Sequence, residues 1–225
     1  MSKRKPHVIA RRDVIKQAAV AAATAVTSSG LAQAQDGPRV APMSADLTAD
    51  EIRTLLALEP NATCGFVRVT YMSKQTLAAG ALPAPFANER PLGSALYFLV
   101  TPVAPVRLHR IRNDQLYHYY LGDPLEVFML HGDGSHERVV VGPDLRAGER
   151  VQLLIPGNTF HTARVAGRRR WFLGASTEWP GVVPADVEIG NLDALAAKYS
   201  AVASDMRAIA ASVQAVPPAR PGAPR

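Results

Sequence analysis

The 225-residue sequence has little of what small secreted, zinc-binding and membrane-embedded proteins require. It contains one cysteine, Cys64, which excludes an internal disulfide framework and a structural zinc site built on several thiolates. Beyond the N-terminal segment no run approaches the about eighteen apolar residues of a membrane-spanning helix, so a transmembrane bundle is excluded. Apolar residues make up 48% and charged residues 20%, which allows a buried core and excludes global disorder.

Basic residues outnumber acidic ones by 25 to 19, which gives a formal charge of +6 and an isoelectric point near 9.8. An excess of basic residues is typical of proteins that bind nucleic acids or membrane surfaces. Residues 1–34, however, hold six basic residues and one acidic residue, a net +5, and leave the rest of the chain near +1. Arg168, Arg169 and Arg170 follow a glycine turn without interleaved aromatics, which predicts a solvated hairpin tip. We therefore expect no nucleic-acid partner.

Residues 1–34 have the organisation of an export signal. A charged start is followed by Arg11 and Arg12, by a mildly apolar run over residues 17–31 and by the small-x-small sequence Ala32-Gln33-Ala34. The paired arginines resemble the twin-arginine export motif, and the weak hydrophobicity of the Ala- and Thr-rich run suits that route better than the general secretory one. An ordinary basic amphipathic helix is the remaining alternative. We predict cleavage after Ala34, a periplasmic location and no stable membrane insertion after cleavage.

The remaining chain divides into four predicted parts. These are a linker over 35–46, a domain over 47–199, a C-terminal helical extension over 200–215 and a Pro/Ala/Arg tail over 216–225 that we expect to be disordered. A capping box of Thr48 and Glu51 predicts a short helix at the start of the domain. After Asp193, apolar residues at three- and four-residue spacing predict a helix packed against the sheet or a partner subunit.

Between these helices the sequence has the pattern of a mainly β fold. Turn residues recur at intervals of about 8–12 residues, and the segments between them are rich in β-branched and aromatic residues. This pattern predicts an all-β sandwich or barrel. The nine predicted strands are Phe66–Tyr71, Ala95–Thr101, Val106–Ile111, Gln115–Tyr120, Glu126–His131, Glu137–Val141, Gln152–Ile155, His161–Val165 and Trp171–Ser176.

Residues capable of chemistry concentrate in segments 107–125 and 148–161. In a barrel the inward side chains alternate along a strand, so an inward His109 predicts that Arg107 and Ile111 also face inward. By the same rule, if Gln115 faces inward, Tyr117 and Tyr119 also face inward and His118 faces outward. The predicted ligand-binding residues are Arg107, Gln115 and His161, and the predicted catalytic residues are His109, Tyr117 and Tyr119.

The motif spacing resembles the two motifs of the cupin superfamily. His109, Ile111, Gln115 and Gly122 occupy the places of His, His, Glu and Gly in the first motif, and Pro156 and His161 those of Pro and His in the second. Further segments, among them Ala95–Leu99, Tyr117–Glu126 and Gly142–Leu145, resemble a branch of small single-domain cupins, and the resemblance spans roughly Leu47 to Tyr199. It implies a double-stranded β-helix (cupin jelly roll) with a short N-terminal helix and a C-terminal helix, usually as a homodimer.

The chain departs from the cupin pattern at positions that matter for a metal. A cupin metal site combines imidazoles with a carboxylate, which suits one divalent transition metal. Here Ile111 and Gln115 replace a His and the Glu, so a metal held by His109, Gln115 and His161 would be weakly bound. The branch also usually has Glu and Arg where this chain has Val69 and Met72, which predicts that a pocket carboxylate is missing as well.

Two classes of function remain open. The first is an exported cupin-domain protein that binds a small polar organic ligand in its barrel, which Ile111 and Gln115 favour. The second is an enzyme, either metal-assisted or a sugar epimerase or isomerase with His109 as base and Tyr117 or Tyr119 as acid. A partner-binding role of the C-terminal helix rests only on its Ala-rich amphipathic pattern. Because cupins host many chemistries, the fold alone does not decide between these functions.

Overall fold

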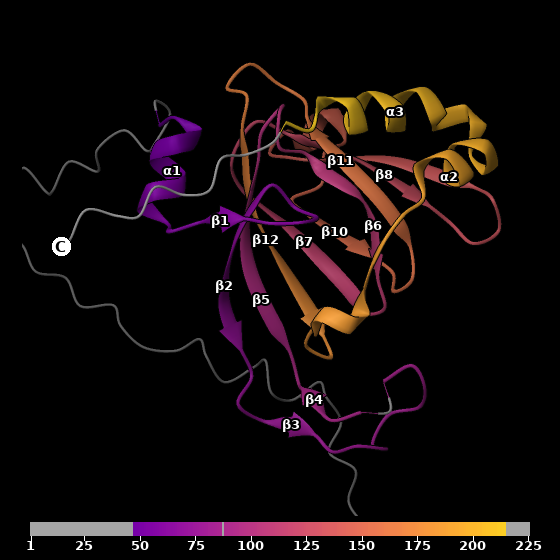
Figure 1. Ribbon diagram of the computed structural model, residues 1–225. Coiled ribbons are helices and arrows are strands. Elements are labelled where there is room, and N and C mark those ends of the chain that lie inside the picture. The colour runs from indigo at the N-terminus through magenta and orange to yellow at the C-terminus, as the bar shows by residue number, and fades with distance from the viewer. Residues whose placement is uncertain (1–46, 87, 215–225) are drawn as a thin grey trace, which may run out of the picture. The chain divides into compact units, whose positions relative to one another are not determined.

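The computed structural model describes residues 47–86 and 88–214, which contain two antiparallel sheets packed face to face (Figure 1). The larger sheet contains, in spatial order, β1 (Glu59–Pro60), β2 (Phe66–Met72), β5 (Ser94–Val100), β12 (Phe172–Trp179), β7 (Asp114–Gly122) and β10 (Gln152–Ile155). The smaller sheet contains β13 (Val187–Ile189), β6 (Val106–Ile111), β11 (Phe160–Val165), β8 (Leu125–Leu130) and β9 (His136–Val141). A separate hairpin pairs β3 (Thr76–Leu77) with β4 (Arg90–Pro91). The predicted mainly β jelly roll is confirmed. The predicted export signal, linker and C-terminal tail lie outside the described residues.

The main core lies between the two sheets. Alternate residues of β5, β7 and β8 point into it, and Phe98, Tyr117 and Val127 are almost completely buried there. Every residue of β8 is buried, because its second face is also covered, by the C-terminal helices. This burial on both faces explains why Leu125–Leu130 is nearly continuously apolar.

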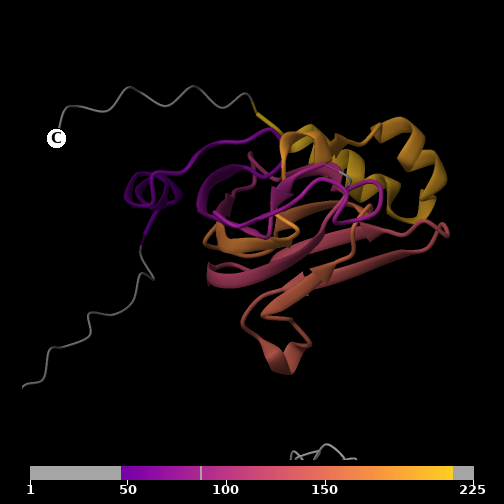
Figure 2. The ribbon, with the colours of Figure 1, turned by 90° about the horizontal axis from the view of Figure 1, so that it is seen from below.

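The C-terminal segment packs along the outer side of the smaller sheet (Figures 1 and 2). The single predicted helix is divided into α2 (Leu192–Lys198), a 3-10 turn (Ser200–Val202) and α3 (Ala203–Ser212). Tyr199 stands at the break, where its hydroxyl donates a hydrogen bond of 2.6 Å to the His131 carbonyl. This segment was predicted to pack against the sheet or against a partner subunit, and in the structure it packs against the sheet.

The N-terminal helix α1 (Ala49–Leu55) has the predicted capping box: Thr48 Oγ1 accepts from the Glu51 amide, and the Glu51 carboxylate accepts from the Thr48 amide. The helix buries Ile52 against Phe66, Leu99 and Trp171, outside the larger sheet. No helix among the described residues is long and apolar enough to cross a bilayer.

All nine predicted strands are present, and those at Val106–Ile111 and Gln152–Ile155 have the predicted bounds. The strands without a prediction, β1, β3, β4 and β13, have two or three residues each, too few for an alternating pattern. The last predicted strand was wrong at its end: β12 continues past Ser176 to Trp179. This extension brings Glu178 into the sheet.

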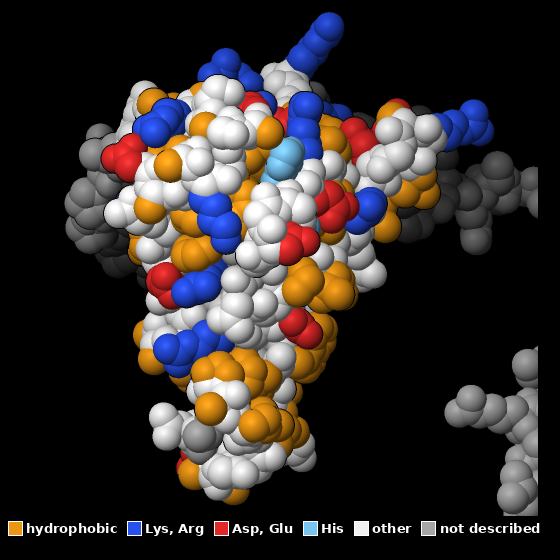
Figure 3. Space-filling view, turned by 90° about the vertical axis from the view of Figure 1, so that its right-hand side faces the viewer, with side chains coloured by type: hydrophobic (Ala, Val, Ile, Leu, Met, Phe, Trp, Pro, Cys, Tyr) orange, Lys and Arg blue, Asp and Glu red, His pale blue; other side chains and the backbone are white. Residues whose placement is uncertain are grey.

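One face of the molecule shows how its surface charge is distributed. In the upper part of Figure 3, basic and acidic side chains are interspersed. Hydrophobic side chains gather in the lower part, where Figure 1 places β3 and β4. This face therefore carries no large region of a single charge.

Gly122 ends β7 with φ +95, and a Cβ at this position would collide with the carbonyl and ring of Trp171. Gly134 has a similar φ of +93, but a Cβ there would meet no atom within 4 Å. We expect Gly134→Ala to lower the free energy of unfolding by about 1–2 kcal/mol through backbone strain alone. Gly122→Ala should cost about 1–3 kcal/mol more through overpacking. Urea denaturation measures both, and equal losses would contradict the packing role of Gly122.

Candidate functional site

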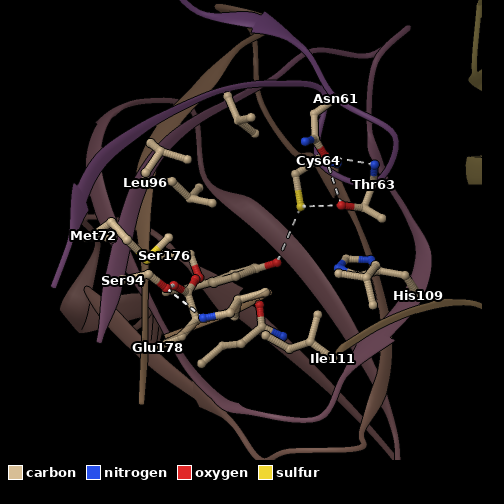
Figure 4. A pocket seen from close by; sticks show the side chains of 17 residues that line it. Asn61, Thr63, Cys64, Met72, Ser94, Leu96, His109, Ile111, Ser176 and Glu178 are labelled. Carbon is tan, nitrogen blue, oxygen red and sulfur yellow. Dashed lines mark hydrogen bonds between the residues drawn. The ribbon is translucent and has the colours of Figure 1, made fainter. Parts of the chain in front are cut away.

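A cavity of about 180 Å³ opens between the two sheets (Figure 4). Its wall is formed by β2, β5, β12 and β7 of the larger sheet, by β6 and β13 of the smaller one, and by the segment 61–64. Apolar side chains form a large part of this wall, among them Val67, Val69, Met72, Leu96, Ile111, Val182 and Val187. Polar groups lie on two opposite sides of the cavity, around Glu178 and around His109, and Asn61 and Thr63 line it from the segment 61–64.

The first set is a row of three side chains across the larger sheet. Glu178 on β12 pairs with Ser94 on β5 and with Gln115 on β7, so all three point into the cavity from one level. The carboxylate accepts hydrogen bonds from the hydroxyls of Ser94, at 2.6 Å, and Ser176, at 2.5 Å. Burial raises the pKa of Glu178, while the two hydroxyls act in the opposite direction. Ser94 is held in turn by the Val182 amide, which donates to its hydroxyl.

His109 stands on the other side of the cavity, on β6 (Figure 4). Its Nδ1 lies 2.7 Å from the Arg107 carbonyl oxygen. Because a carbonyl only accepts, Nδ1 carries the proton and Nε2 presents a lone pair. Burial lowers the pKa of His109 to about 4, so the ring is neutral at physiological pH.

Behind His109 three further groups form a hydrogen-bonded chain. His161 Nδ1 donates to the Thr159 carbonyl, so its Nε2 accepts from the Tyr117 hydroxyl at 3.0 Å. The same hydroxyl oxygen lies 4.0 Å from Cys64 Sγ. Burial lowers the pKa of His161 far below its ordinary value, raises that of Tyr117 and raises that of Cys64 to about 11. All three groups are therefore uncharged at neutral pH.

The structure separates Arg107 from the cavity. The expectation that Arg107 and His109 face the same way is wrong, because three residues of β11, from His161 to Ala163, oppose four of β6, from Val106 to His109. The extra residue is a bulge that reverses the alternation, so Arg107 is exposed and donates to the Ala62 carbonyl. Ile111 lines the cavity as expected.

Alternation along β7 is confirmed for Gln115 and Tyr117, which both line the cavity, and for His118, which lies on the opposite face against Thr177. Tyr119 points inward but packs on Phe172, and its hydroxyl donates to the Gly122 carbonyl rather than facing the cavity. Asp114, which adjoins the site in sequence, is exposed and accepts from the Gly157 amide.

The donors at the expected metal position do not fit a cupin metal centre. The rings of His109 and His161 lie close, with centroids 4.3 Å apart, but His161 Nε2 is already occupied by the Tyr117 proton and His161 is completely buried. Gln115 contributes no charge. Among the described residues no group of three or more His, Cys, Asp and Glu side chains is arranged to hold a metal ion.

The expected absence of a pocket carboxylate is wrong. Val69 and Met72 do line the cavity, but Glu178 supplies a carboxylate from another strand. Sequence reasoning missed it because the predicted strand ended at Ser176, so Glu178 was assigned no face. The signal that could have found it is the alternation of Ser176 and Glu178 in a strand extended by two residues.

The chain belongs to the family described as Cupin superfamily (DUF985), whose model matches residues 50–190. It is similar to the solved structure of a hypothetical protein from Leishmania major, with 25% identity over 74% of this chain and 99% of that one and a TM-score of 0.64. It is also similar to a protein from Shewanella oneidensis, with 26% identity over 72% of this chain and 97% of that one and a TM-score of 0.63. No curated protein matches. The chain is thus a cupin-domain protein.

The lowered pKa of His109 makes the stability of the fold depend on pH. Between the ordinary value of 6.5 and about 4, the unfolded imidazole binds a proton that the folded one does not, so stability falls as the pH falls through this window. His109→Asn keeps an N–H donor for the Arg107 carbonyl but cannot titrate. We expect it to remove up to about 3 kcal/mol of this pH dependence, measured by urea denaturation from pH 7 to 4.

The matched control is His136→Asn, which makes the same exchange at an exposed histidine on β9. If His109→Asn and the wild type lose stability equally between pH 7 and 4, the desolvated state assigned to His109 is contradicted.

Proposed function

We propose that this chain is an exported cupin-domain protein that binds a small polar organic molecule in the cavity between its sheets. Export by the twin-arginine route is part of this proposal and rests on residues 1–34. The observation that carries the binding role is a set of three polar groups in the wall of the cavity: the Glu178 carboxylate, the Gln115 amide and His109 Nε2.

The Gln115 amide supports the proposal most directly. Its residue is only 5% exposed, yet among the described residues its side chain makes no hydrogen bond. His109 Nε2 also makes no hydrogen bond among the described residues, since the hydrogen bond of the ring is made by Nδ1. Both residues line the cavity, and neither group belongs to the fully buried unpaired polar atoms of the described residues, which are on Arg53, Arg90 and Asn113. Both groups are therefore open to a ligand in the cavity.

The size of the cavity limits what it can hold. At about 180 Å³ it is smaller than the about 300 to 1,000 Å³ typical of sites for drug-sized ligands. The apolar wall provides contact for a compact hydrocarbon body, while the polar groups stand on two opposite sides. This arrangement suits a compact molecule with polar groups at two places.

A second candidate function is proton transfer on a bound sugar-like or other carbonyl compound. Two titratable groups on opposite sides of one cavity, His109 and Glu178, have pKa values shifted in opposite directions, which is an arrangement found in acid–base catalysis. His109 Nε2 is free to act as the base. Tyr117 is a poor acid here because it donates its proton to His161 and its pKa is raised. In an enzyme of this kind Glu178 would take the role of the acid.

Val69→Trp tests the binding role. Val69 lines the cavity from an exposed position, so an indole there should fill the entrance without disturbing the core. Leu154→Trp is the matched control, because Leu154 is similarly exposed but lies on the outer face of β10, between the buried Leu153 and Ile155. Mass spectrometry of small molecules released by denaturing the protein recovered from the periplasm should find a bound compound in the wild type and in Leu154→Trp, and none in Val69→Trp.

Equal occupancy in all three proteins, or none in the wild type, would contradict the binding role. Incubation in D2O separates the two candidate functions: deuterium on carbon in the released compound supports proton transfer, and its absence supports binding alone.

A further inference from the structure

Among the described residues, Glu178 is the only carboxylate in the cavity wall, and no lysine or arginine lines that wall. Of the other three buried carboxylates among the described residues, Asp123 accepts a hydrogen bond from the Arg170 amide, and the remaining two have a cationic partner. Asp186 forms an ion pair with Arg90 at 3.0 Å, and Glu126 contacts the guanidinium groups of Arg138 and Arg164. Glu178 has only two serine hydroxyls, although its residue is 3% exposed.

The remaining titratable groups around the cavity do not compensate this charge. His109 faces Glu178 from β6, Tyr117 from β7 and Cys64 from the segment before β2. All three are neutral at physiological pH, and the residues that β2 and β13 contribute to the wall are apolar. Ionising a carboxylate in such surroundings is costly unless a cation joins it.

We propose that the ligand of this cavity is a compact organic cation, a protonated amine whose ammonium group pairs with the Glu178 carboxylate. This inference rests on the proposed binding function and specifies the chemical class of the ligand. An anionic ligand is disfavoured at the same place, because it would meet the carboxylate with no cation between them.

The hydrogen-bonding capacity of the row fits an ammonium group. Each serine hydroxyl donates one hydrogen bond to the carboxylate, so both oxygens keep a lone pair for the ligand. Gln115 lies directly opposite Glu178 in the β7–β12 ladder, and its amide oxygen offers a third acceptor on the same level. An ammonium carries three donors, which matches this set. His109 Nε2, on the far side, can accept from a hydroxyl or second N–H at the other end of the ligand.

Three probes with the same ring and different charge test the charge preference: cyclopentylamine, cyclopentanol and cyclopentanecarboxylate. We expect the full-length protein at pH 7.5 to bind the amine on the order of tenfold more tightly than the alcohol, measured by titration calorimetry, and to bind the carboxylate more weakly than both. Glu178→Gln should lose on the order of tenfold in amine affinity and change alcohol affinity by less than about threefold.

The control variant is Glu188→Gln, which removes the same charge at an exposed position on β13, where Glu188 forms an ion pair with Arg110. This variant should leave all three affinities unchanged. A second measurement needs no variant. Lowering the pH should weaken the binding of the amine to the wild type as Glu178 becomes protonated, and it should have little effect on the binding of the alcohol. If the alcohol or the carboxylate binds as tightly as the amine, the cavity binds ligands but the cation inference is wrong. If no probe binds, the proposed binding function fails and the inference fails with it.

Discussion

The register of β12 between β5 and β7 determines what this cavity contains. Because β12 is central in the larger sheet, its inward residues stand in rows with those of both neighbours: Leu96, Ser176 and Tyr117 in one row, and Ser94, Glu178 and Gln115 in the next. Shifting this strand by one residue would turn Glu178 out to solvent and bring Trp179 inward. The carboxylate, its two hydroxyl donors and the facing amide thus come from one sheet, which provides a rigid support.

His109 and the groups behind it differ chemically from the row that contains Glu178, and the contrast defines the site. His109, His161 and Tyr117 are buried and Cys64 is half-buried; the four are connected through hydrogen bonds or close contacts and are uncharged. The imidazoles that a cupin would direct to a metal are fixed by backbone carbonyls and by the Tyr117 proton. The charge of the cavity therefore comes from Glu178, on the side where the cupin pattern led us to expect no carboxylate.

Much of the fold could be predicted from sequence because its signals are local. Turn residues and alternating apolar residues place nine strands, and the capping box places α1. The site was less predictable, because it depends on details of pairing. The orientation of Arg107 is reversed by a bulge that exists only once β6 meets β11. Glu178 points inward because the last residues of β12 pair with β5 on one side and β7 on the other. The sequence Glu178-Trp179-Pro180 has no strand pattern of its own, so this pairing could not be predicted locally.

The central claim is that Glu178 is a buried carboxylate whose cationic partner is supplied by the ligand. The most direct test is a pH titration of the Glu178 side-chain carboxyl resonance by carbon-13 NMR, with and without saturating cyclopentylamine. We predict that the pKa lies above the ordinary glutamate value of about 4.3 in the free protein and falls when the amine is bound, because the ammonium stabilises the ionised form. An ordinary pKa in the free protein, or one that the amine leaves unchanged, would contradict this account.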